Sequence, residues 1–557
     1  MSKWIGSPKL AMALAFALMI VIACGGAAAT PVPQAATTPP QAPATSASAT
    51  EAAPAATPVA TEAPATAKRF ETLFVAQIGN PVSITCWDYS ATDEADILVY
   101  FADAMFSPDR DAVIQGSAVD EWEMESLTSW RLHLREGMTS HDPKYGVFDA
   151  EDAVASLDSC LRENAKSITR TPAPIVHREV EILDENTFRM TLQAPGAATV
   201  PNYLSAYVFL SPKEYLAEVE DFSKNPLGGG ALKFVEWLPN ERIVGEKFDD
   251  WWGPELAFDR IEWRIIPDAF TRKAELLTGG LDILPFLVPE VAEEVESDAC
   301  CRVASTLSAR FVYTVLPVRR PPYDDVRVRQ ALNYAINKQE IVDTLFRGIG
   351  AIPMTGINHA FLPEYDSTRV GYPFNPEKAK QLLAEARADG VKIDDVNLFA
   401  TNDRYTLDKE TGEAVAGYWR DVLGLKVEYF PQSRSELFPK GMALKMEDPW
   451  QVGNGNGLVR VDGPYSLWFQ KRADPRSRGD EYAAGTDEWD KLIDDLSLTT
   501  SGSPESIKQS RELDQIFTEF APWALLVNYI DLYGINDRID WEPYSTEQRL
   551  FYDLKLK

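Results

Sequence analysis

The sequence predicts an α/β protein with more than one lobe. Its 557 residues are too many for one ordinary hydrophobic core. Segments that alternate like half-buried strands are interleaved with segments that have helical periodicity, which is typical of α/β architecture. Residues 261–266, 268–278 and 281–284 read as strand, helix and strand. Such a unit places its two strands parallel in one sheet.

Strands dominate the first part of the body. An extended segment over residues 71–77 opens the fold. Residues 130–135 alternate like a half-buried strand. The runs 180–183 and 187–192 flank a turn at 184–186, which predicts a hairpin.

Helices are marked by their start and stop signals. Asp325 can cap a helix whose apolar positions fall on one face, and Asn375 with Pro376 starts another helix, which Gly390 ends. A third helix stops at Gly424 and leads into a strand. Helices over 487–498 and 504–520 precede a final apolar strand, 524–530.

Composition excludes several classes of function. Lys and Arg number 54 against 84 Asp and Glu, so the net charge is −30. This charge repels nucleic acid and anionic lipid headgroups, and no nucleic-acid partner is expected. There is no Gly-x-Ser-x-Gly elbow, His-Glu-x-x-His motif or phosphate loop. We therefore expect a protein that is not an enzyme and has no cofactor or metal; a secreted hydrolase is the least supported alternative.

The five cysteines are Cys24, Cys86, Cys160, Cys300 and Cys301, and no Cys-x-x-Cys motif occurs. Their spacing does not determine a disulfide connectivity. The adjacent pair Cys300–Cys301 is open to three readings: two thiols, which is the commoner arrangement, a metal site or a vicinal disulfide.

The N-terminus is predicted to be a signal peptide followed by a flexible tether. Two lysines precede an apolar run over residues 10–23, which is too short to span a membrane and ends at Cys24. Residues 21–24 resemble the bacterial lipobox, so residues 1–23 are predicted to be a lipoprotein signal peptide and Cys24 the lipidated residue. Residues 24–69 are almost wholly Ala, Pro, Thr and Ser and are predicted to be a disordered tether. We expect an extracytoplasmic protein held to a bacterial membrane by this lipid alone.

Six stretches of the body resemble, in order and spacing, the bacterial extracellular solute-binding proteins of family 5, the dipeptide-, oligopeptide- and nickel-binding type. They are SWRLHLREGMTSHD from Ser129, FDAEDAVASLD from Phe148, NPLGGGALKFVEWLPNERIV from Asn225, IIPDAFTRKAELLTGGLDI from Ile265, PPYDDVRVRQALNYAINKQEIVDTLFRG from Pro321 and FNPEKAKQLLAEA from Phe374.

This resemblance implies a two-lobed periplasmic-binding-protein type II clamp with an extra inserted subdomain. The expected domains are a discontinuous lobe I (70–110, 225–310 and 515–557), the inserted subdomain (111–224) and lobe II (311–514). It also implies a monomer that captures a small peptide between its lobes and presents it to an ABC permease. The same transporter role with an oligosaccharide, a metal chelate or another small metabolite is the alternative.

The resemblance further implies where ligand is held. In peptide-binding members an aspartate takes the ligand's α-amino group and an arginine its carboxylate. Asp462 and Arg404 lie near these positions, although a turn residue and a solvated loop arginine are the alternative roles. The predicted ligand-binding residues are Asp462, Arg404, Asn454, Asn456, Trp87, Trp450 and Trp468. For the tryptophans, a place in the core is the other reading.

Overall fold

The computed structural model describes residues 70–81, 83–88, 92–162, 178–193, 200–442, 446–454, 486–499, 502–546 and 548–557. All of these residues fall within the compact unit Ala65–Lys557. None of the helices in these ranges combines the length and apolar character that a membrane span requires.

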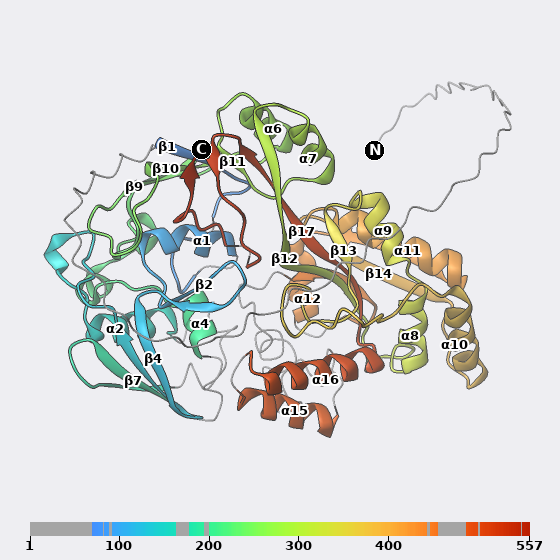
Figure 1. Cartoon of the computed structure of the whole chain (residues 1–557). Helices are drawn as coiled ribbons and strands as arrows, with labels where there is room; N and C mark the ends of the chain where they lie inside the picture. Colours follow the sequence, from blue (N-terminus) through green and yellow to red (C-terminus); the bar gives the residue numbers. More distant parts are fainter. Residues whose placement is uncertain are drawn as a thin grey trace, which may run out of the picture. The chain divides into compact units, whose positions relative to one another are not determined.

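An 11-stranded sheet runs through the unit (Figure 1). Its order is β15-β14-β16-β12-β17-β11-β1-β10-β9-β8, and β13 pairs with β17. The strands are β1 (Phe70–Gln77), β8 (Leu232–Leu238), β9 (Arg242–Lys247), β10 (Phe258–Ile265), β11 (Ile283–Leu284), β12 (Cys301–Val315), β13 (Ala351–Pro353), β14 (Asp395–Thr401), β15 (Lys426–Gln432), β16 (Trp450–Asn454) and β17 (Trp523–Asn536).

The predicted strand–helix–strand unit is confirmed. β1 pairs in parallel with both β10 and β11, and α6 (Ala269–Leu277) connects the latter two. Asp268 caps α6 by accepting a hydrogen bond from the backbone N–H of Thr271. After the helix, Gly279 takes a φ of +79°, which a side chain would disfavour.

A second parallel set is formed by β14 with β15 and β16. α10 (Pro376–Ala388) and α11 (Asp408–Leu423) contact each other near this set. As predicted, Asn375 caps α10, Asp325 caps α8 (Val326–Tyr334), and Gly424 ends α11 in the left-handed region.

A separate four-stranded sheet lies within residues 111–224. Its order is β4-β5-β7-β6, and all three pairings are antiparallel. The strands are β4 (Val119–Ser126), β5 (Ser129–Leu134), β6 (Arg178–Ile182) and β7 (Thr187–Leu192), and α2 (Ala150–Cys160) contacts β6. The predicted hairpin is confirmed, with Asp184 accepting hydrogen bonds from the backbone N–H groups of Asn186 and Thr187 in the turn.

The other described elements are eight helices, two 3₁₀ turns and four short strands. The helices are α1 (Thr92–Phe101), α4 (Val200–Tyr207), α5 (Lys213–Glu218), α7 (Pro289–Glu296), α9 (Lys338–Leu345), α12 (Arg434–Met442), α15 (Asp487–Ser497) and α16 (Pro504–Phe520), with 3₁₀ turns at Pro143–Tyr145 and Phe222–Lys224. The short strands are β2 (Phe106–Pro108), β3 (Ile114–Gly116), β18 (Ile539–Asp540) and β19 (Lys555–Leu556).

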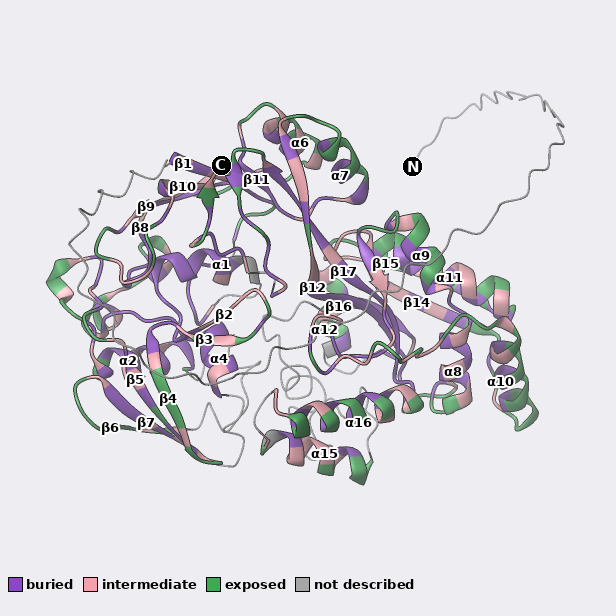
Figure 2. Cartoon of the chain, viewed as in Figure 1, coloured by how far each residue is buried: buried purple, intermediate pink, exposed green. Residues whose placement is uncertain are grey.

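Separate hydrophobic cores serve the two ends of the large sheet (Figure 2). We call β11, β1, β10, β9 and β8 the first half and β16, β14 and β15 the second half. Two cores contain side chains of the first half, and two others contain side chains of the second half. β12 contributes Ala304 to a core of the first half and Phe311 to one of the second. β12 and β17 therefore pass from one half to the other.

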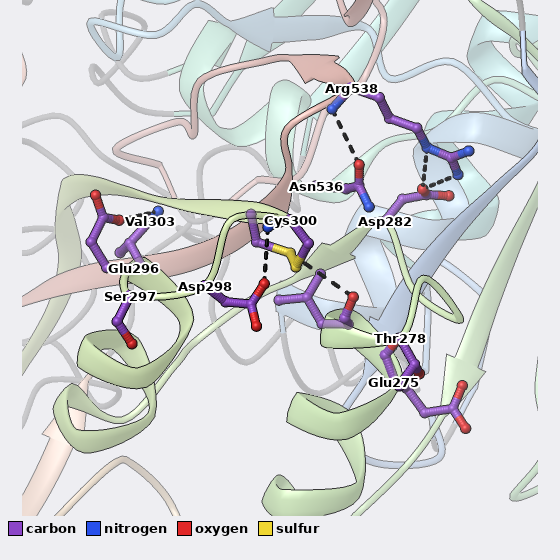
Figure 3. The surroundings of a disulfide bond; sticks show 12 residues. Glu275, Thr278, Asp282, Glu296, Ser297, Asp298, Cys300, Val303, Asn536 and Arg538 are labelled. Carbon is purple, nitrogen blue, oxygen red and sulfur yellow. Dashed lines mark hydrogen bonds and ion pairs between the residues drawn. A yellow bond between two sulfur atoms is a disulfide. The ribbon is translucent and has the colours of Figure 1, made fainter.

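The structure pairs four of the five cysteines. Cys86, after β1, bonds to Cys160 at the end of α2. Cys300 bonds to its neighbour Cys301 at the start of β12, so the vicinal disulfide replaces the commoner reading of two thiols (Figure 3). The backbone N–H of Cys300 donates to the Asp298 carboxylate, and Cys301 is buried in a core of the first half.

Candidate functional site

A β-bulge lies where the two crossing strands pass between the halves. The pairing of β12 with β17 slips between Leu307 and Phe311, so residues 308–310 face Tyr529 alone. The side-chain amide of Asn528 donates to the carbonyl oxygens at both ends of these three residues, at 2.7 and 2.8 Å. These bonds satisfy backbone carbonyl groups that the sheet leaves unpaired and so stabilise the bulge. From the bulge, the Arg310 side chain reaches Asp531 of β17.

Arg310 forms a buried ion pair with Asp531 of β17. The Asp531 side chain is wholly buried, and the Arg310 side chain is one-tenth exposed. A buried charge requires such a partner. The guanidinium carbon also lies 4.2 Å from the ring centre of Phe286, 5.3 Å from that of Tyr529 and 5.7 Å from that of Tyr405.

Two of these three rings, Phe286 and Tyr405, follow the carboxyl ends of parallel strands, one in each half. Phe286 comes two residues after β11, and Tyr405 comes four residues after β14. In open α/β sheets, ligands bind in the crevice beyond the carboxyl ends of the strands. Residues beyond such ends in both halves meet at Arg310, which makes this region the candidate ligand site.

The loop that carries Arg404 is held from three sides. The Asp408 carboxylate accepts hydrogen bonds from the backbone N–H groups of Arg404 and Tyr405 at 3.1 and 3.2 Å, and burial raises the pKa of Asp408. The Tyr529 hydroxyl donates to the Thr406 carbonyl oxygen at 2.8 Å. The side-chain amide of Gln451, in β16, donates to the carbonyl oxygen of Asp408 at 2.7 Å.

Tyr405 packs directly on the glycine-rich end of β16. A Cβ built on Gly453 would stand 1.9 Å from the Tyr405 ring, so only glycine leaves room for it. The Arg404 guanidinium carbon is 4.7 Å from the centre of the same ring. The structure thus brings Arg404 beside the strand end that holds Asn454, whose backbone pairs with Phe311. Three predicted site residues, Asp462, Asn456 and Trp468, lie outside the described residues.

Two of the predicted tryptophans are core residues. Trp87 packs edge-on against Phe222, and the guanidinium of Arg162 lies over its ring at 4.3 Å. Trp450 is 2% exposed and fills the space that the missing side chain of Gly441 leaves. Burial gives both rings a packing role, and their predicted contact with ligand stays a prediction.

Sequence reasoning missed Arg310, Asp531 and Phe286. The available signal was a charge within each of two apolar runs, Arg310 in residues 309–316 and Asp531 in residues 524–535, since Arg and Asp are almost never buried unless they are paired. Within the described ranges, no group of three His, Cys, Asp or Glu side chains is placed to hold a metal ion.

Comparison with known proteins gives matches over most of the body. The family described as bacterial extracellular solute-binding proteins, family 5 Middle, matches residues 112–475. Haem-binding protein A of Haemophilus influenzae is 29% identical over 49% of this chain and 54% of its own length. The dipeptide-binding protein of Escherichia coli is 28% identical over 54% of this chain and 60% of its own length. The chain therefore aligns with little more than half the length of these curated relatives.

One solved structure establishes the fold. The ABC transporter-associated periplasmic binding protein DppA from Helicobacter pylori, in complex with the peptide STSA, superposes with a TM-score of 0.74. It is 19% identical and covers 88% of this chain and 98% of that one. The predicted fold class, a two-lobed type II clamp with an extra domain, is confirmed.

Proposed function

This chain belongs to family 5 of the bacterial extracellular solute-binding proteins, and on that premise we propose that it captures a small peptide for an ABC importer. The family is one of binding proteins and not of enzymes. The expected partners are a small ligand and a permease, and the chain works outside the cytoplasm as a monomer.

The placement of Arg404 carries the proposal of a carboxylate-bearing cargo. Its guanidinium lies beside the Tyr405 ring, next to the end of β16. A guanidinium grips a carboxylate through two parallel hydrogen bonds. On a chain of net charge −30, a local cation at the strand ends favours an anionic group on the ligand. Asp462 supplies the carboxylate for the ligand's amine, with Asn454 and Asn456 as amide partners.

A metal chelate is the second candidate cargo. One relative is named for binding haem, and the chain is as similar to it as to the dipeptide-binding relative. Haem also carries carboxylates, so Arg404 suits either cargo. The two differ in the amine: a peptide needs Asp462, whereas haem does not.

We also propose the domain boundaries and the lipid anchor given by the sequence. Lobe I comprises residues 70–110, 225–310 and 515–557, the inserted subdomain 111–224 and lobe II 311–514. Residues 1–23 are the signal peptide, Cys24 carries the lipid, and 24–69 form the tether.

Thermal unfolding of the full chain tests the cargo, because a ligand that binds only the folded state raises the midpoint. The probes are the dipeptide Met-Leu, the tetrapeptide STSA, haemin and maltose. At a ligand concentration of about 100 times the Kd, binding raises the free energy of unfolding by roughly 2.7 kcal/mol, which raises the thermal midpoint by a few degrees. We expect the shift with a peptide, and we expect its loss in Arg404→Ala and in Asp462→Asn.

Arg387→Ala is the matched control, since this exposed arginine of α10 pairs with Asp394 at the amino end of β14, opposite to the carboxyl end that precedes Arg404. It should leave the peptide shift unchanged. A shift with haemin alone that survives Asp462→Asn would replace the peptide with the chelate. A shift with maltose alone would contradict both cargoes while keeping the binding role.

A further inference from the structure

We propose that Arg310 is a clasp between the two halves of the large sheet and sets how far apart they stand before any cargo binds. The proposal needs only the two-lobed fold. It does not depend on which cargo the protein carries.

The clasp is anchored in the strands that cross between the halves. Arg310 lies at the end of the β12 bulge and pairs with Asp531 of β17. Its backbone N–H also donates to the Ser308 hydroxyl at 3.1 Å. Because both charges of the pair belong to crossing strands, motion of either half need not separate them.

The rings beside the guanidinium belong to different halves. Phe286 follows β11 of the first half and packs against its core. Tyr405 follows β14 of the second half and packs against a core there. Both lie within about 6 Å of the guanidinium carbon, the range in which cation–π attraction acts. Separation of the halves would remove one of these contacts and keep the ion pair.

Residues of both halves pack closely around the clasp. The space left beside Arg310 is only about 10 Å³. Its lining includes Phe286 and Leu287 from the first half and Phe346 and Thr406 from the second. A change in the distance between the halves therefore has to alter the packing at Arg310. Phe286 itself has a φ of +57°, a rare conformation for a side-chain-bearing residue, and such conformations cluster at switch regions.

The test measures the distance between the halves in the cargo-free full chain. Spin labels are attached through unnatural amino acids at Glu241, in the turn between β8 and β9, and at Lys380 of α10. Both positions are exposed, and the native cysteines stay intact. The variants are Arg310→Lys, which keeps a charge for Asp531 but loses the planar guanidinium, and Phe286→Leu and Tyr405→Leu, which each remove one ring.

We expect each variant to raise the population outside the wild-type distance peak by about tenfold, toward longer distances. Adding Arg310→Lys to Tyr405→Leu should change little further, because both changes remove the same contact. If Arg310→Lys fails to fold, the two ring variants carry the test, since they leave the ion pair in place. Unchanged distance distributions in the ring variants would overturn the proposal.

Arg549→Lys is the matched control. Arg549 forms a buried pair with Asp96 at 2.9 Å and donates to Gln77 at 2.9 Å, and its guanidinium carbon lies 5.8 Å from the Phe286 ring centre. These partners all lie in or against the first half. The change should lower the thermal midpoint and leave the label distance alone. An equal shift of the distance in Arg549→Lys would mean that general destabilisation moves the halves, and the clasp would be rejected.

Discussion

Asp103 is a carboxylate whose pKa is changed by burial in the folded protein. It is buried, and the indole N–H groups of Trp251 and Trp252 donate to its two oxygens at 3.3 and 2.9 Å. Burial raises the pKa of Asp103 to about 7, against the lowering effect of the two indoles and of Arg135. The folded state therefore prefers the neutral acid. The contribution of Asp103 to the free energy of unfolding is fully present below about pH 4 and is lost as the pH rises through about 7.

The effect of Asp103→Asn on the free energy of unfolding should change sign between pH 8 and pH 4. At pH 8 the amide avoids a buried charge and should raise the free energy of unfolding by about 2–3 kcal/mol. At pH 4 the wild type is already neutral, and the loss of one indole bond should cost about 1 kcal/mol. Thermal unfolding at both pH values checks this, and a gain of equal size at pH 4 would contradict the assigned pKa.

Asp184→Asn is the control with the opposite pH trend. Hydrogen bonds from Thr187 and Asn186 lower the pKa of Asp184. Its contribution to stability is present above the unfolded pKa and is lost as the pH falls through the lower folded pKa. The variant should be less stable than the wild type at pH 8, and this difference should shrink toward pH 3.

Gly453 tests the packing that places Arg404. In Gly453→Ala the new methyl group overlaps the Tyr405 ring, which must move, and we expect a loss of about 1–3 kcal/mol in thermal unfolding. Gly417→Ala in α11 is the matched change, because nothing lies within 4 Å of its Cβ. There alanine should stabilise the helix by about 0.5–1 kcal/mol. A neutral Gly453→Ala would show that Tyr405 does not lie on β16.

At the scale of elements, one disulfide ties the small sheet's helix to the large sheet. The Cys86–Cys160 bond joins the segment after β1 to the end of α2 across 74 residues of sequence. Cys300–Cys301 closes a ring between neighbours. A crosslink lowers the entropy of the unfolded chain in proportion to the logarithm of the loop that it closes. The two bonds should therefore differ in their effect on stability.

Replacing both members of each pair by serine measures this difference. Cys86→Ser with Cys160→Ser should lower the free energy of unfolding by about 4 kcal/mol, and Cys300→Ser with Cys301→Ser by about 1 kcal/mol. Denaturant unfolding of the two double variants gives both values. Equal losses would mean that the stabilisation does not come from the entropy of the unfolded chain.

At the scale of the whole molecule, a strongly acidic body is combined with a predicted lipid anchor. A net charge of −30 disfavours contact between the body and an anionic membrane surface. Retention at the membrane should then depend on the lipid at Cys24.

Cys24→Ser should move the protein from the membrane fraction to the soluble fraction of its host cells, as measured by fractionation and immunoblotting. The serine variant of the Cys300–Cys301 pair should stay with the membrane. Membrane retention of Cys24→Ser would contradict the predicted lipidation.

Local signals in the sequence determined many of the elements. Asp325, Asn375 and Gly424 begin or end helices through bonds and backbone angles within a few residues, so each was readable without the tertiary structure. The alternation of the 187–192 strand and the strand–helix–strand order near β10 were equally local. The placement of Arg404 after a strand was also local, and it fell beside the glycine-rich end of β16.

Only the tertiary structure decided the bulge, the Arg310–Asp531 ion pair and the cysteine pairing. Arg310 and Asp531 are 221 residues apart, and their contact depends on a slip in strand register that no periodicity records. Cys86 reaches Cys160 because two elements pack together, whereas spacing alone allows other pairings. Trp87 and Trp450 are of a residue type that often lines binding clefts. In the structure both belong to hydrophobic cores, because the burial of a side chain depends on the neighbours that folding brings to it. The sequence thus determined what each segment becomes, and long-range packing decided which side chains meet.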